Sequence, residues 1–160
     1  MRHADDKQFV RVHFSQSTPV PDRCEGCTFV ECDFTRADLS GCRFVDCRFE
    51  GCDLSSCRLA GAGFQEVEWV RCKAMGVAWD SCNAFLFGIR VHDSNLDYGS
   101  FRGVDLSRSG FFGGSVRETD FTGANAQGCV FREVAMDGAR FEGTELKGAE
   151  FAHVTGWTID

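Results

Sequence analysis

The chain carries ten cysteines, the residues in it with the widest range of chemistry. Thiolates bind zinc and exchange disulfides, so a cysteine-rich chain of this size raises both functions. Cys24 and Cys27 form a C-x-x-C pair, a spacing found in zinc sites and redox motifs. A zinc site needs a second such pair and a redox site needs a helix N-terminus, and no second C-x-x-C follows. The pair is therefore interpreted as structural, and a cysteine redox or metal protein is kept as the remotest alternative function.

Sequence motifs of common enzymes are missing. The histidines, His3, His13, His92 and His153, are scattered, and no HExxH, G-x-S-x-G or P-loop motif accompanies them. His92 precedes Asp93, but a catalytic pair also needs a nucleophile or a pocket. We expect a protein that is not an enzyme, with no catalytic residue, no cofactor and no metal.

The cysteines follow a spacing that no single secondary-structure element explains. Residues 42–59 read CRFVD CRFEG CDLSS CRL, in which a cysteine and a large apolar residue both recur every five residues. An α-helix repeats every ~3.6 residues and a strand every two, so a period of five must belong to a larger coil that returns on itself. An internal repeat of this kind outranks local propensity in predicting the fold.

The repeat extends over most of the chain. One position in five holds a large apolar residue, as at Phe29, Phe34 and Leu39, and the residue two positions earlier is small. Neither position is ever charged, although 26% of the chain is charged, so two of every five residues are expected to point inward. The pattern holds to about residue 83, fails across residues 84–90 and resumes two residues out of register.

Individual repeats match the known motif A(D/N)LXX: residues 37–41 read ADLSG and residues 119–123 read TDFTG. Over residues 24–154 the chain resembles the pentapeptide-repeat family. The resemblance implies an all-β fold, a right-handed quadrilateral β-helix with four pentapeptides to each coil. The cysteine-rich first half resembles the quinolone-resistance (Qnr) proteins, which bind DNA gyrase as mimics of double-stranded DNA.

In such a β-helix, residues twenty apart stack in columns, and the register break becomes a two-residue bulge near 84–90. We expect about six to seven coils with a core built mainly from two columns. Their members are Phe29, Phe49, Trp69, Phe111, Phe131 and Phe151, and Leu39, Leu59, Trp79, Phe101, Phe121 and Phe141. Another column is expected to run through Phe44, Phe64 and Ala84. The sequence leaves open whether Phe85, Leu86 and Phe87 are packed or exposed.

The rest of the chain is expected to close the two ends of a single domain. Residues 1–23 are predicted to form an N-terminal strand over Phe9–Phe14 and a capping segment. Residues 24–154 form the β-helix, and residues 155–160 form a C-terminal cap that includes Trp157 and Ile159. Every cysteine except Cys24 occupies a small inward position, so we expect reduced, shielded thiols with Cys24 the most reactive.

The net charge and the lack of long apolar stretches limit the kinds of partner that the protein is expected to bind. The net charge of −7 disfavours nucleic acid as a partner and permits basic protein surfaces. Charged residues interrupt the first segment, and no stretch approaches the ~20 apolar residues that span a bilayer. We therefore expect a cytoplasmic protein without a signal peptide and with neither nucleic acid nor membrane as a partner.

Two sets of outward residues are candidate partner-binding sites. Asp33, Asp53, Asp97 and Asp137 are assigned to one face at coil spacing, where carboxylates could stand in for phosphates. Val30, Val70 and Phe112 are assigned to one apolar outer row. The sequence favours a non-enzymatic protein that binds another protein through a face of the β-helix. The alternative is a DNA mimic that binds DNA gyrase and protects it from its poisons, and either protein could be a homodimer.

Overall fold

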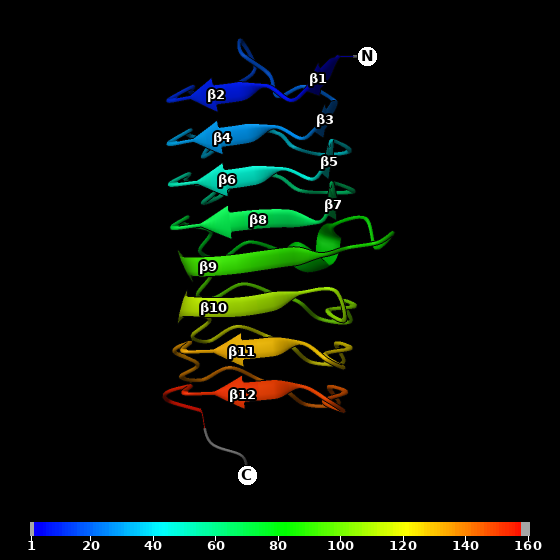
Figure 1. The fold of residues 1–160 in the computed structure, drawn as a ribbon, viewed down its shortest axis with the longest axis vertical. Helices are drawn as coiled ribbons and strands as arrows, with labels where there is room; N and C mark the ends of the chain where they lie inside the picture. The colour runs from blue at the N-terminus through cyan, green and yellow to red at the C-terminus, as the bar shows by residue number, and fades with distance from the viewer. Residues whose placement is uncertain (1, 158–160) are drawn as a thin grey trace.

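A computed structural model describes residues 2–157 as a parallel β-solenoid (Figure 1). One eight-stranded sheet runs the length of the molecule and a four-stranded sheet covers the first half of a neighbouring face. The long sheet contains β2 (Gln8–Val10), β4 (Thr28–Val30), β6 (Arg48–Glu50), β8 (Val67–Val70), β9 (Ile89–Asn95), β10 (Gly110–Ser115), β11 (Val130–Arg132) and β12 (Glu150–Ala152). The short sheet contains β1 (His3–Asp5), β3 (Arg23–Glu25), β5 (Arg43–Val45) and β7 (Gly63–Gln65). The sole helical segment within residues 2–157 is the short 3-10 turn η1 (Trp79–Ser81).

The coils are held together by backbone hydrogen bonds between residues about one coil apart. The N–H of Leu39 donates to the carbonyl of Arg58 at 2.8 Å, and the N–H of Arg58 donates to that of Ala37 at 3.3 Å. All paired strands are parallel, and Phe29 is paired with Phe49 and Phe49 with Trp69. Each coil therefore hydrogen-bonds only to its neighbours above and below, as in other repeat proteins.

Tight turns between the faces explain why the strands are short. At one corner the N–H of Cys42 donates to the carbonyl of Leu39 at 3.0 Å, with Gly41 at φ 72°. A positive φ at the third residue of a β-turn favours glycine, because a side chain there is strained. The adjacent polar residue also helps: the N–H of Ser40 donates to Asp38 Oδ1 at 3.0 Å.

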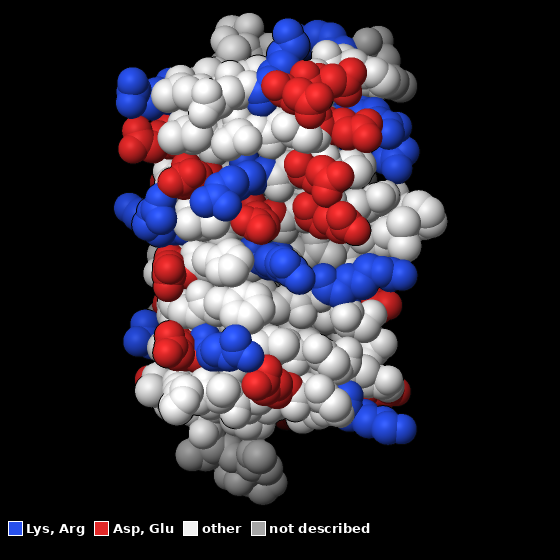
Figure 2. Space-filling view, in the orientation of Figure 1, with Lys and Arg blue, Asp and Glu red and all other residues white. Residues whose placement is uncertain are grey.

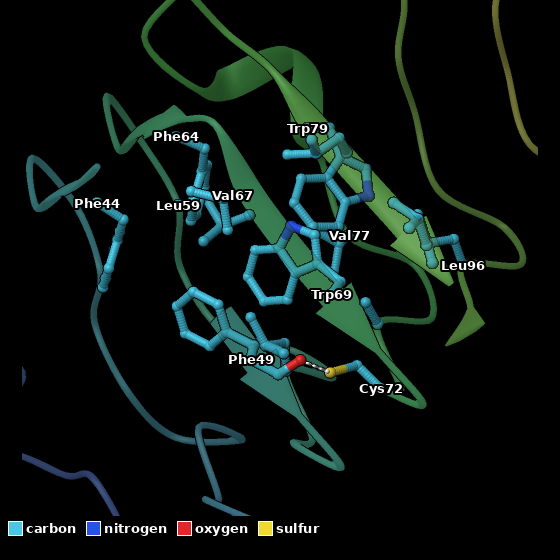
Figure 3. Close-up of a cluster of buried hydrophobic side chains, with 14 of the residues drawn as sticks. Phe44, Phe49, Leu59, Phe64, Val67, Trp69, Cys72, Val77, Trp79 and Leu96 are labelled. Carbon is cyan, nitrogen blue, oxygen red and sulfur yellow. Dashed lines mark hydrogen bonds between the residues drawn. The ribbon is translucent and has the colours of Figure 1, made fainter. Parts of the chain in front are cut away.

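Aromatic rings fill the interior in the two predicted columns. In the first column Phe29 stacks on Phe49 with centroids 4.7 Å apart, and in the second Trp79 stacks on Phe101 at 5.7 Å and 2°. Rings from the two columns also meet edge to face (Figure 3). Most of these side chains are buried; only Phe141 and Phe151, next to the C-terminal end, are partly exposed.

The first coil differs from the expected capping segment. β1 and β2 pair in register with β3 and β4, and Phe9 and Phe14 stack on Phe29 and Phe34, each at 4.9 Å. Residues 3–22 are thus a complete coil, and one strand of the long sheet per coil gives eight coils in place of six to seven. The alternation of apolar and polar residues in Phe9–Phe14 led to the prediction of a single strand. Phe9 and Phe14 are five residues apart, so they also follow the period of the repeat.

The bulge is present, but Phe87 replaces Ala84 as its inward residue. β8 pairs with β9 through Val67 and Ile89, a separation of 22 residues where other coils show 20. Ala84 is exposed, whereas Phe87 is only 3% exposed. The two extra residues move the point at which the chain re-enters the core, so the large ring of Phe87 is buried there instead of the side chain of Ala84.

At the C-terminal end Trp157 covers the last coil. Its ring stacks on Phe151 at 4.4 Å and meets Phe141 edge to face at 5.2 Å. Ile159, the other predicted capping residue, lies outside the described residues. Within residues 2–157 the chain forms no helix of the length and hydropathy needed to cross a bilayer.

Candidate functional site

All ten cysteine thiols are free, and most of them act as buried hydrogen-bond donors. Cys72 Sγ donates to the carbonyl of Phe49 in the preceding coil at 3.3 Å, and Cys52 Sγ donates to that of Phe29 at 3.3 Å (Figure 3). Thr119 Oγ1 makes the same contact with the carbonyl of Leu96 at 3.2 Å. A threonine can replace a cysteine here, so the position requires a small inward donor.

Hydrogen bonds with Cys52 lower the pKa of Cys72 and lower that of Cys32 to about 7, but burial makes several other thiols hard to ionise. Burial raises the pKa of Cys42 to about 11, and that of Cys47 and Cys129 to about 12. Cys24 is fully buried, and burial together with the neighbouring thiol Cys27 raises its pKa further. The prediction that Cys24 is the most reactive thiol is therefore wrong, because the thiolate is the reactive form.

Cys24 fills a column position above Phe44, to which it is paired in the parallel sheet. No group of three or more His, Cys, Asp or Glu side chains in the described part of the chain is arranged to hold a metal ion.

Two shallow hollows mark the outer surface. One of about 660 Å³ lies under the first-coil loop and is lined by residues that include Ser15, Pro19, Arg36 and Arg58. The other, of about 520 Å³, lies beside the bulge and is lined by Asp46, Glu66, Glu68, Gly88, Arg90 and Arg108. Neither hollow is lined by a cysteine or a histidine.

The four candidate aspartates do not form one row. Asp33 and Asp53 are neighbours in one row, and Lys73 follows Asp53 in it. Asp97 and Asp137 lie in a parallel row and are separated by Arg117, whose guanidinium is 4.0 Å from Asp97 and 3.9 Å from Asp137. The reason is local: Asp33 and Asp53 precede an inward residue, whereas Asp97 and Asp137 follow one.

Three of these aspartates accept hydrogen bonds within the coil. Asp33 accepts hydrogen bonds from the hydroxyl and N–H of Thr35, which lower the pKa of its carboxyl group, and it also contacts His13 Nδ1 at 2.9 Å. Asp53 accepts a hydrogen bond from the N–H of Ser55 at 2.9 Å but is partly exposed. Asp97 is only 7% exposed and accepts a hydrogen bond from the N–H of Arg117 at 2.8 Å. Asp137 is exposed.

The predicted apolar strip is interrupted. Along this row of the long sheet Glu50 lies between Val30 and Val70, and His92 lies between Val70 and Phe112. Val70 is 7% exposed and thus offers little surface. Phe112 is partly buried: its ring stacks on His92 at 5.1 Å and receives the guanidinium of Arg132 at 5.8 Å.

Charges of both signs are distributed over the face shown in Figure 2. Many of them are neighbours in adjacent coils, such as Arg48 and Glu68 at 2.9 Å. Exposed pairs of this kind contribute little to stability, typically under ~1 kcal/mol, but they divide the surface into small regions of either sign. The face shown in Figure 2 thus carries charges of both signs and is not uniformly acidic, as mimicry of a phosphate backbone would require.

Four exposed large apolar residues lie near the middle of the solenoid. Phe85 and Leu86 are 61% and 39% exposed at the bulge, and Met75 and Tyr98 are also exposed. The N–H of Gly76 donates to the carbonyl of Asp97 at 2.8 Å, so Met75 and Tyr98 lie on adjacent coils. Sequence reasoning missed Met75 and Tyr98, although Tyr98 occupies a corner position where many repeats carry glycine.

Several solved structures resemble this chain. Solved structures with similar coordinates include the full-length plasmid-mediated fluoroquinolone resistance protein QnrB1, with a TM-score of 0.46, 20% identity and coverage of 93% of each chain. HetL, a pentapeptide repeat protein involved in heterocyst differentiation regulation from the cyanobacterium Nostoc, gives a TM-score of 0.46 and 15% identity, covering 92% of this chain and 84% of its own. The search of curated proteins found no match.

Two family profiles also match the sequence. Residues 23–101 match the pentapeptide repeat region, and residues 117–151 match pentapeptide repeats in eight copies. These segments include coils on both sides of the bulge, and the twenty-residue register of the parallel strands agrees with four pentapeptides to a coil. The chain belongs to the pentapeptide-repeat family.

Proposed function

We propose that this protein acts without catalysis, by binding another protein through the outer surface of its β-helix near the bulge. The observation that carries the proposal is the exposure of Phe85 and Leu86 side by side, at the point where the repeat is broken. The loop that bears them projects from the solenoid between β8 and β9 (Figure 1). Adjacent exposed apolar side chains on a projecting loop are typical of contact surfaces.

The loop is held in place at both ends, which favours binding. Asn83 Oδ1 accepts a hydrogen bond from the N–H of Phe85 at 2.9 Å, and Phe87 is anchored in the core. The N–H of Phe87 donates to the carbonyl of Ala84 at 3.3 Å. A preorganised loop loses less conformational entropy on binding than a flexible one.

The test compares proteins retained from an extract of the source organism by three immobilised forms. Wild-type protein should retain a partner that Phe85→Ser/Leu86→Ser loses. Val10→Ser is the matched control, because Val10 is also an exposed apolar residue but lies in the first coil, far from the bulge. Equal retention by wild type and the double variant would overturn the proposal.

A second candidate function is protection of DNA gyrase by DNA mimicry, in the cytoplasm. It is supported by the net charge of −7, by the sequence resemblance to the Qnr proteins, and by the accessibility of Asp53 and Asp137. The interleaved charges of the surface weigh against it, so it ranks second.

Gyrase supercoiling in the presence of a quinolone tests this alternative. Wild-type protein should inhibit supercoiling or protect the enzyme, and Asp53→Asn/Asp137→Asn should weaken that effect, more so at low salt. Asp33 and Asp97 are unsuitable for the test, because Asp33 also contacts His13 and Asp97 is nearly buried. If wild-type protein affects neither supercoiling nor quinolone poisoning, gyrase is excluded as the partner.

A further inference from the structure

The hollow beside the bulge has one acidic side and one basic side. Asp46 and Glu66 are at the corner of consecutive coils, and Arg108 lies at the same corner below the bulge. On the adjoining parallel strands β8 and β9, Glu68 and Arg90 are neighbours in the strand register. Down the solenoid the order is thus acidic and then basic, and Figure 2 shows acidic side chains above a basic band that crosses the middle of the visible face.

Gly88 keeps the two sides apart. Its backbone lies between Glu66 and Arg108: a side chain placed there would be 3.2 Å from Arg108 Cβ and 3.8 Å from the backbone nitrogen of Glu66. Because glycine has no side chain, the floor of the hollow is bare, and its volume is about 520 Å³. The bulge therefore produces the hollow as well as the exposed loop.

The charges around this hollow are available for a partner. Within residues 2–157 no ion pair joins Asp46, Glu66, Arg90 or Arg108 to another side chain. By contrast, Glu68 is already paired with Arg48 at 2.9 Å. Two acids and two bases therefore face one concave surface without neutralising one another directly.

We infer that this hollow is a self-complementary contact through which two copies of the chain pair side by side and antiparallel. A two-fold axis passing between the coils of Glu66 and Gly88 would place Asp46 of each copy opposite Arg108 of the other, and Glu66 opposite Arg90. An isologous contact needs such a self-complementary patch, in which each residue meets its counterpart by symmetry. A partner of a single sign would leave half of the charges opposed by like charge.

The proposed contact is short. From Asp46 to Arg108 it spans three coil steps, or about 14 Å at the ~4.8 Å spacing of strands. A contact of this length corresponds to the weak, transient class of interfaces. The pairing is independent of the partner bound at Phe85 and Leu86.

Sedimentation velocity over a concentration series tests the pairing with two charge-reversed variants. The acid-reversed variant is Asp46→Lys/Glu66→Lys and the base-reversed variant is Arg90→Glu/Arg108→Glu. Wild-type protein should form dimers at low salt, and each variant alone should remain monomeric because it opposes like charges. An equimolar mixture of the two variants should recover the dimer, since each supplies the sign that the other needs. Recovery should fall at 0.5 M salt, at which screening is strong.

Arg36→Glu/Arg58→Glu is the matched control: both arginines line the other hollow, and the variant should dimerise like wild type. Circular dichroism checks that every variant folds, and Arg90→Gln/Arg108→Gln, which only removes charge, provides a milder form of the test that should also weaken dimerisation. The inference is overturned if wild-type protein is monomeric at all concentrations, if the reversed variants dimerise as well as wild type, or if their mixture stays monomeric. A gain of thermal stability with a free zwitterionic amino acid, in a protein that stays monomeric, would assign the hollow to a small ligand instead.

Discussion

The indole rings of Trp69 and Trp79 meet edge to face, with centroids 5.6 Å apart and planes at 74°. The ring nitrogens of both are buried without a hydrogen-bond acceptor. Figure 3 shows Nε1 of Trp69 turned toward the ring of Trp79, an arrangement suited to an N–H···π contact. Nε1 of Trp79 has no comparable partner among the residues drawn.

This difference predicts unequal effects of two conservative substitutions. Trp79→Phe removes an unpartnered N–H and places a phenyl ring above Phe101, so it should cost under ~1.5 kcal/mol despite the smaller volume. Trp69→Phe removes the N–H···π contact as well as volume and should cost more. Urea denaturation monitored by circular dichroism measures both free energies of unfolding. A larger loss for Trp79→Phe would contradict this reading of the pair.

Truncation of a core aromatic ring should lower the free energy of unfolding more than truncation of a surface ring. Phe121 lies fully buried between Phe101 at 5.3 Å and Phe141 at 4.8 Å, so Phe121→Ala should cost about 3–5 kcal/mol. Phe112→Ala should cost about 1 kcal/mol, because the ring is partly exposed and lies on the outer surface, where it contacts His92 and Arg132. Equal losses in urea denaturation would show that the assignment of inward and outward positions is wrong.

The buried thiols predict loss of stability at high pH. The pKa of Cys129 is raised by burial from 9.0 in the unfolded chain to about 12 in the folded protein. A raised folded-state pKa stabilises the fold below pH 9, and this contribution is lost as the pH rises from 9 to 12, at ~1.4 kcal/mol per unit for each such thiol. Cys129→Ala should therefore show a shallower decline than wild type between pH 9 and 10.5 in urea denaturation. Parallel declines would mean that Cys129 does not titrate in this range.

Asp120 should make the stability of the fold fall at low pH, the opposite of the effect of the thiols. It contacts Arg102 at 3.0 Å and Arg140 at 3.7 Å. Burial raises the pKa of its carboxyl group, but hydrogen bonds from Thr122 and the charge of Arg102 outweigh that effect and lower the pKa to about 2. A lowered pKa stabilises the fold above the unfolded value of 3.8, and the contribution disappears as the pH falls toward 2. Asp120→Asn should lower the melting temperature at pH 6 but hardly at pH 2; the same loss at both values would rule out the charge as the cause.

The period of five, together with the resemblance to the pentapeptide-repeat family that it supports, was sufficient to predict the fold and the two main aromatic columns, because every coil repeats the same inward and outward pattern. It could not predict how the backbone crosses the bulge. A two-residue insertion shows that the register changes, but not which side chain re-enters the core, and the choice between Ala84 and Phe87 depended on the shape of the loop. The same limit applies to the surface. Asp97 follows an inward residue while Asp53 precedes one, so the two lie in different rows of one face.

Phe85 and Phe87 allow folding and binding to be separated within a single loop. The two rings are two residues apart, yet Phe85 is 61% exposed and Phe87 is 3% exposed. Phe87→Ala removes a buried ring from the hydrophobic core and should cost about 3–5 kcal/mol of stability. Phe85→Ala removes an exposed ring and should change stability by less than about 0.5 kcal/mol.

If the bulge binds a partner, Phe85→Ala should abolish retention of that partner in the pull-down while the melting temperature stays at the wild-type value. Phe87→Ala, assayed well below its lowered melting temperature, should retain the partner at least partly. Retention that follows the melting temperatures of the two variants would show that the partner recognises the folded solenoid in general and not the tip of the loop.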